Sequence, residues 1–115
     1  MLLTLAAPAP ARVQVGADEF GYTLSRASIK AGPAIVQLAN FGEDEHDLRL
    51  RRIGGTKVYR VDTVAPGHVR ELEARFVPGR FRLWCSLADH RARGMRATLL
   101  VKRGLTTAER QATTP

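Results

Sequence analysis

Apolar and polar residues alternate with a period of two along most of the chain. In the segment 80–85 the alternation puts Phe81, Leu83 and Cys85 on one side and arginines on the other. Successive side chains of a β-strand point to opposite faces, so this pattern predicts a strand with one face in a core and the other in water. The same period, or a short apolar run, marks the segments 13–15, 35–39, 46–51, 58–64 and 95–101.

The segment 69–76, VRELEARF, fits either a strand or a short amphipathic helix. We predict a strand there. Glycine and proline interrupt the chain at intervals typical of short antiparallel strands. These residues are Gly16, Gly32, Pro33, Gly42, Gly54, Gly55, Pro66, Gly67, Pro78, Gly79 and Gly94. The pattern predicts an all-β fold, a Greek-key β-sandwich of about seven to eight short strands.

The composition of the chain indicates where its domain begins and ends. The chain has 115 residues, 44% of them hydrophobic and 25% charged, and we expect one domain over residues 12–103. Residues 1–11 resemble the tail of a secretory signal but lack a basic start, so they are either a signal remnant or a loose apolar segment. Residues 104–115 are polar and are expected to form a disordered tail. No stretch reaches the length of a membrane span.

The chemistry lies in one short segment, Cys85-Ser-Leu-Ala-Asp-His90-Arg-Ala-Arg-Gly-Met95. It offers a thiol, an imidazole and a thioether between two predicted strands. The strand that starts at His46 places a second imidazole on its inward face, beside Leu48. Thiolate and imidazole with a weak axial sulfur suit copper, whereas zinc favours several cysteines and magnesium or calcium favours carboxylates. The alternative interpretation makes Cys85 and Met95 core residues and His90 a solvated loop residue.

The run CSLADH, followed by RARGM and the strand RATLLVK, resembles the copper loop of the cupredoxins, the type 1 blue copper proteins. The segment from Asn40 to Leu48 resembles the other ligand segment of that family. The resemblance covers about residues 12–103. It implies that His46 and His90 are the equatorial ligands, Cys85 the thiolate and Met95 the axial ligand of one copper ion. It also implies a one-electron carrier.

Two residues near the ligands need a separate interpretation. Many cupredoxins have Asn after the first histidine, where this chain has Asp47, and we expect the corresponding hydrogen bond to join Asp47 and Ser86. Such groups orient ligands and tune the redox potential. By its alternation, however, Asp47 falls on the outward, solvated face of its strand. His68, in a Pro-Gly-His turn, matches no ligand position and is expected at the surface.

Charge indicates the partner. Lysine and arginine number 18 against 11 acidic residues, a net charge of +7, which favours an acidic redox protein such as a cytochrome or an oxidase domain. The resemblance implies electron exit through the edge of His90. Arg91, Arg93 and Arg96 lie beside this loop and are either a basic rim for the partner or ordinary solvated surface. The arginines on strands are interpreted as dispersed, without the aromatics that nucleic-acid readers use, so we expect no nucleic acid. They are Arg49, Arg60, Arg80 and Arg82.

Other functions remain open. A copper carrier or storage protein would use the same ligands, and a copper-free sandwich would serve as a protein-interaction module. Catalysis is not expected, because after His46 and His90 only His68 remains for further copper centres. We expect a monomer that is exported to the periplasm or another extracytoplasmic compartment.

Overall fold

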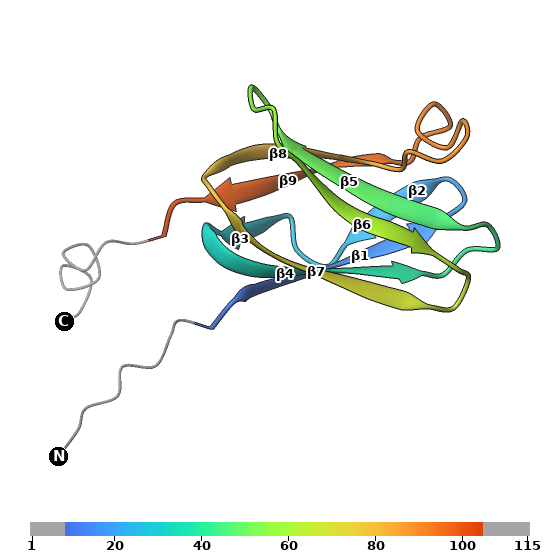
Figure 1. The fold of residues 1–115 in the computed structure, drawn as a ribbon, viewed down its shortest axis with the longest axis horizontal. Helices are drawn as coiled ribbons and strands as arrows, with labels where there is room; N and C mark the ends of the chain where they lie inside the picture. Colours follow the sequence, from blue (N-terminus) through green and yellow to red (C-terminus); the bar gives the residue numbers. More distant parts are fainter. Residues whose placement is uncertain (1–8, 105–115) are drawn as a thin grey trace, which may run out of the picture.

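Two β-sheets packed face to face make up the protein (Figure 1). The computed structural model describes residues 9–104, and most of the predicted N-terminal segment and polar tail lie outside the described residues. The strands are β1 (Ala11–Asp18), β2 (Gly21–Leu24), β3 (Ser28–Lys30), β4 (Gly32–Asn40), β5 (His46–Arg52), β6 (Val58–Val64), β7 (Val69–Phe76), β8 (Gly79–Trp84) and β9 (Arg96–Lys102). One sheet has the order β2-β1-β4-β7 and the other β3-β9-β8-β5-β6.

The all-β prediction is confirmed, and the segment 69–76 is a strand, β7. Strands β2 and β3, with 4 and 3 residues, were not predicted because they are too short for an alternating pattern. They raise the count within residues 9–104 to nine. In the same part of the chain no helix has the length and apolarity that a membrane crossing needs.

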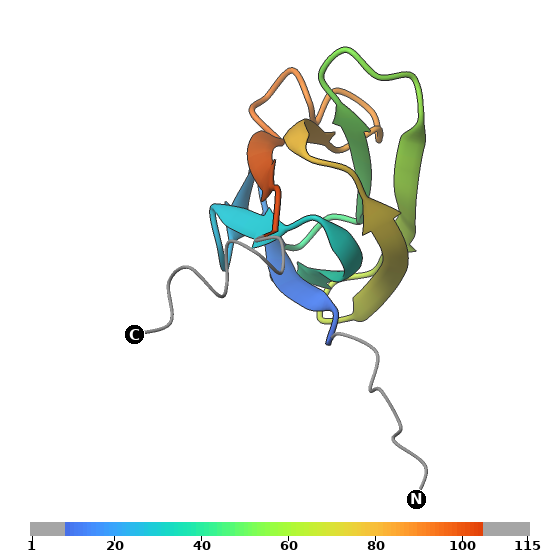
Figure 2. The same ribbon diagram turned by 90° about the vertical axis from the view of Figure 1, so that its left-hand side faces the viewer.

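The chain passes between the sheets several times, and its neighbours in space are mostly distant in sequence. Strand β1 pairs in parallel with β4, and β3 pairs in parallel with β9. Strand β8 lies between β5 and β9, antiparallel to both. Figure 2 shows the two sheets from one end. This order brings the start of β5 beside the end of β8, which is the arrangement that a site built from residue 46 and the segment 85–95 requires.

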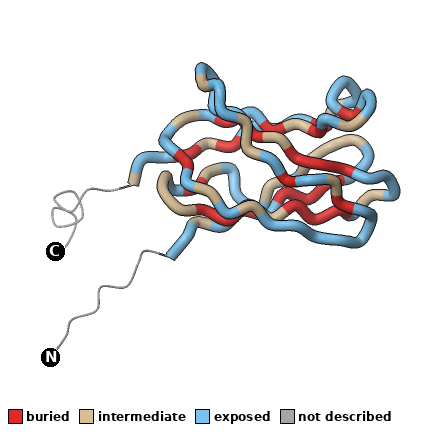
Figure 3. Tube along the Cα trace, in the orientation of Figure 1, coloured by how far each residue is buried: buried red, intermediate tan, exposed pale blue. Residues whose placement is uncertain are grey.

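Buried residues lie on strands of both sheets (Figure 3). Their side chains form one hydrophobic core cluster. The largest side chains with less than 2% exposure include Phe81, Leu38, Leu48, Leu50, Leu83 and Leu99. At the end of the sandwich where β8 begins, the ring of Phe76 meets Phe81 edge-on and packs on Tyr59, with centroids 5.2 and 4.7 Å apart. The opposite end carries the turn 41–45, the β1–β2 hairpin and the long β8–β9 loop (Figure 1).

Candidate metal centre

Three of the four predicted ligands converge in the structure. His46 is the first residue of β5, and Cys85 and His90 lie on the loop between β8 and β9. One donor atom from each lies within 4.8 Å of the other two. The Cys85 Sγ and His90 Nδ1 are 3.6 Å apart, and the two imidazole centroids are 5.1 Å apart. All three residues are buried, so the arrangement belongs to the interior of the protein and not to its surface.

Backbone hydrogen bonds within the loop bring the fourth residue, Met95, to the same place. The Met95 amide donates to the carbonyl of His90 at 3.0 Å, and its carbonyl accepts from the amide of Cys85 at 3.2 Å. The Met95 side chain is fully buried. Gly94 permits this turn because its φ is +120° and a Cβ there would lie 3.1 Å from the carbonyl oxygen of Phe20. The thioether of Met95 remains a predicted axial ligand.

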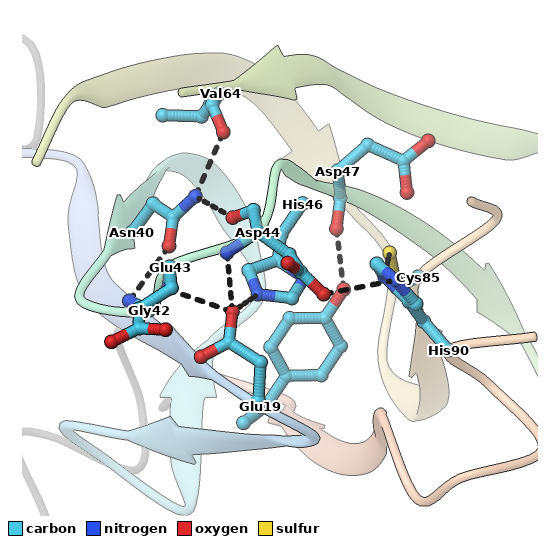
Figure 4. A network of polar contacts seen from close by, with 11 residues as sticks. Glu19, Asn40, Gly42, Glu43, Asp44, His46, Asp47, Val64, Cys85 and His90 are labelled. Carbon is cyan, nitrogen blue, oxygen red and sulfur yellow. Dashed lines mark hydrogen bonds and ion pairs between the residues drawn. The ribbon is translucent and has the colours of Figure 1, made fainter. Parts of the chain in front are cut away.

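His46 is oriented by a carboxylate that the sequence analysis did not identify. The His46 Nε2 lies 2.9 Å from Glu19 Oε1, and this oxygen also accepts from the amides of Glu43 and Asp44, at 2.8 and 2.6 Å. These amide hydrogen bonds, more than His46 itself, lower the pKa of Glu19 to about 2. Figure 4 shows the carboxylate between the turn and the imidazole. Because the ionised carboxylate accepts a hydrogen bond from the Nε2–H group, the Nδ1 of His46 keeps its lone pair.

The surroundings of the His46 Nδ1 atom test whether a metal ion fits this site. Among the described residues this atom has no hydrogen-bond partner although it is completely buried. A buried polar atom without a partner is unfavourable, and such atoms usually have an explanation such as an ion. Here the atom belongs to a group with a second imidazole and a thiol, which are ligands that copper accepts. The residues therefore fit a soft metal ion.

The Cys85 thiol is protonated more readily than an exposed one, because burial raises its pKa. Metal binding would have to displace this proton, since the thiolate is the ligand. Tyr22, from the β1–β2 hairpin, packs near the thiol and donates its hydroxyl hydrogen bond to the carbonyl of Asp47. Burial raises the pKa of Tyr22 as well, so this hydroxyl stays a donor.

The prediction that Asp47 faces water is wrong. Asp47 is only 2% exposed, because the start of the ligand loop folds over that side of β5. The expected bond to Ser86 is confirmed, and there are two of them. The Ser86 amide donates to one carboxylate oxygen at 2.7 Å, and the Ser86 hydroxyl donates to the other. The residue that follows Cys85 is therefore attached to the residue that follows His46.

Asn40 fixes the turn that leads into His46. Its side-chain amide donates to the carbonyls of Asp44 and Val64, both at 2.8 Å, and its oxygen accepts from the amide of Gly42 at 2.9 Å. Asn40 is 2% exposed; its bond to Val64 is buried and the other two are partly buried. They hold the turn against β6 (Figure 4), which places the amides of residues 43 and 44 where Glu19 needs them.

The surroundings of His90 are mixed in charge. His90 is 8% exposed, its Nε2 lies 3.8 Å from the carboxylate of Asp44, and its ring packs on Phe20 at 4.9 Å. Of the predicted basic rim, Arg93 pairs with Asp89 at 2.7 Å and lies over the Phe20 ring.

His68 is exposed, in the turn between β6 and β7, as predicted. It is not part of the metal-binding group found among the described residues.

Comparison with known proteins places the fold. No family model matches the chain, and no curated protein matches it. Solved structures do. The reduced auracyanin of Roseiflexus castenholzii is 13% identical over 83% of this chain and 99% of its own, with a TM-score of 0.66.

Two further structures give the same result. Auracyanin A of Chloroflexus aurantiacus, described as a blue copper protein, is 12% identical over 82% of this chain and 100% of its own, with a TM-score of 0.65. The amicyanin of Paracoccus versutus is 21% identical over 84% of this chain and 85% of its own, with a TM-score of 0.56. The chain has the cupredoxin fold.

Proposed function

We propose that this protein binds one copper ion through His46, Cys85, His90 and Met95 and carries single electrons between redox partners. The observation that supports this most is the buried, unpartnered Nδ1 of His46 within 4.8 Å of a thiol and a second imidazole. Bound copper would supply a one-electron couple between its two oxidation states. The imidazoles and the Cys85 thiolate would be the strong ligands, and the buried Met95 the weak axial one.

Hydrogen bonds between protein residues support this arrangement. Glu19 fixes the tautomer and direction of His46, and Asp47 attaches Ser86, the neighbour of Cys85. The turn from Cys85 to Met95 closes by its own backbone hydrogen bonds. A site whose ligands are positioned in advance changes little when an electron arrives or leaves, and this lowers the reorganisation that electron transfer requires. These hydrogen bonds, which position the ligands, thus support a carrier.

A catalytic role is not proposed. Among residues 9–104 the one group of donors suited to a metal is the group described here, and His68 lies outside it. The sequence pattern of residues 1–11 supports an extracytoplasmic location, and the net charge of +7 supports an acidic redox partner.

Storage or transport of copper is the competing function, because it would use the same ligands.

The test is addition of Cu(II) to the metal-free protein. We expect one equivalent to bind with an intense blue colour from charge transfer between thiolate and metal, and Cys85→Ser to abolish that colour. His68→Ala is the matched control, since it removes an exposed imidazole and should leave the colour unchanged. A folded wild-type protein that stays colourless would refute the site. Reversible one-electron voltammetry with metal retained against a chelator would support a carrier, and rapid loss to the chelator would support copper delivery.

A further inference from the structure

The outer face of the five-stranded sheet is covered by arginines that the strand order brings together. We call it the arginine face. It consists of Arg49 and Arg51 on β5, Arg60 on β6, Arg80 and Arg82 on β8, Arg96 on β9 and Arg91 on the loop, around Trp84. The interpretation that these arginines are dispersed is wrong, because β5, β8 and β9 are far apart in sequence but adjacent in the sheet.

The register makes like charges direct neighbours. Arg49 stands opposite Arg60, and Arg51 stands opposite Arg82. Facing like charges on paired strands destabilise a sheet. Strands β8 and β9 contain no acidic residue at all. In the described part of the chain, Arg49 alone of this face reaches a carboxylate, that of Asp47 at 3.5 Å.

The outer face of the four-stranded sheet differs in its charge. It carries a row in which Gln14, Gln37 and Glu71 are joined by side-chain hydrogen bonds of 2.9 and 3.3 Å. The exposed positions of β7 carry two acidic and two basic residues, Glu71 and Glu73 with Arg70 and Arg75. The excess positive charge of the protein is therefore concentrated on one face and is not spread over both.

The arginine face is also concave. A groove of about 300 Å³ is lined by Arg80, Arg82, Arg91 and Arg96. The guanidinium of Arg91 lies 4.9 Å from the centroid of the Trp84 ring, and that of Arg51 lies 6.0 Å from it. Stacking of this kind holds a guanidinium in place with its N–H groups free, which suits bidentate contact with carboxylates.

We propose that the arginine face is the docking surface for a partner protein with an acidic surface, whose carboxylates enter this groove. Nucleic acid fits less well, because the one tryptophan that could stack on a base is already covered by guanidinium groups. A bilayer is flat on this scale and would meet the rim of the groove only. That the partner exchanges electrons rests on the proposed function, but the docking does not.

The arginine face differs in charge from the end of the molecule where His90 lies. There Glu43, Asp44 and Glu45 are exposed and Glu19 lies beside them, so an acidic partner would be repelled. The arginine face instead reaches the metal loop from the side, through Trp84, which precedes Cys85, and Arg91, which follows His90 in the sequence. An acidic partner guided by charge would therefore approach the sheet face and not the His90 edge.

The probe is a peptide of twelve glutamates, added to the full metal-free chain at low ionic strength. Trp84 is the only tryptophan, so its fluorescence reports binding at the arginine face directly. We expect the double variant Arg80→Gln/Arg82→Gln to weaken binding about tenfold, as two lost charge pairs at low salt would do. Arg12→Gln/Arg75→Gln, which removes equal charge from the other sheet, is the matched control and should change binding less than about twofold.

Amide chemical shifts should move on β8 and β9 and not in the turn 41–45. Equal weakening by both double variants would show attraction to net charge alone and overturn the proposal. A thymidine dodecamer, or vesicles of phosphatidylglycerol and phosphatidylcholine, that bound more tightly than the peptide through the same arginines would also overturn it. Because no copper is present, these results are independent of the Cu(II) titration, and either proposal can fail without the other.

Discussion

Replacement of Asn40 by alanine removes three hydrogen bonds of a buried side chain from the turn before His46. Two connect the side-chain amide to the carbonyls of Asp44 and Val64, and one connects its oxygen to the amide of Gly42. Each contributes roughly 0.5–1.5 kcal/mol net, so the free energy of unfolding should fall by roughly 2–4 kcal/mol. For a domain of this size that corresponds to a fall in Tm of about 10–25 °C.

The assay is urea and thermal unfolding of the metal-free protein followed by circular dichroism. Gln37→Ala is the matched control, because it also removes side-chain hydrogen bonds but on a solvated face, and it should change the free energy of unfolding by no more than about 0.5 kcal/mol. Asn40→Asp keeps the shape and the acceptor for Gly42 but loses both donors, and it should destabilise the protein at least as much near neutral pH.

The result that would refute this reasoning is an Asn40→Ala protein as stable as Gln37→Ala. In that case the turn would be held by the packing around it, and the Asn40 amide would contribute nothing measurable. Stability lost in Asn40→Ala but not in Asn40→Asp would indicate that side-chain volume matters and the donors do not.

Three further predictions concern the ligands and their supports. Glu19→Gln should lower the Tm of the metal-free protein at neutral pH. Because the pKa of Glu19 is lowered from 4.5 to about 2, the stabilisation by its carboxylate is complete above pH 4.5 and is lost as the pH falls through about 2. The Tm difference between wild type and Glu19→Gln, measured in thermal scans at successive pH values, should therefore vanish near pH 2. Met95→Leu should retain copper but raise the midpoint potential in voltammetry, and an unchanged midpoint would argue against an axial thioether. Gly94→Ala should destabilise the loop by about 1–3 kcal/mol in urea unfolding, because its φ is +120° and the added Cβ would press on the carbonyl of Phe20; a loss below about 0.5 kcal/mol would contradict this.

The sequence predicted the strands and the ligand loop because both leave local patterns. Alternation placed His46 and Cys85 inward, and spacing within one segment placed His90 and Met95 near Cys85. Glu19 could not be predicted, since its bond to His46 spans 27 residues and depends on how the β1–β2 hairpin meets the turn 41–45.

The predictions that Asp47 faces water and that the arginines are dispersed were wrong for a related reason. Alternation tells on which side of a strand a residue lies, but not what covers that side. Asp47 is outward on β5 and is nevertheless buried, because Ser86 lies over it. The arginines are outward as predicted, but their assembly into one face depends on the strand order, which no local pattern reveals.

The aromatic rings at one end and the ligand-bearing loops at the other make the sandwich unequal along its length. The packed rings of Tyr59, Phe76 and Phe81 should resist opening, whereas the loop end depends on a few hydrogen bonds beside an unpartnered imidazole nitrogen. Local opening is easiest where apolar contacts are fewest. We therefore expect amides of the segment 85–95 to exchange with deuterium before those of β8 in the metal-free protein. An ion would then enter at this end while the rest of the sandwich stays closed.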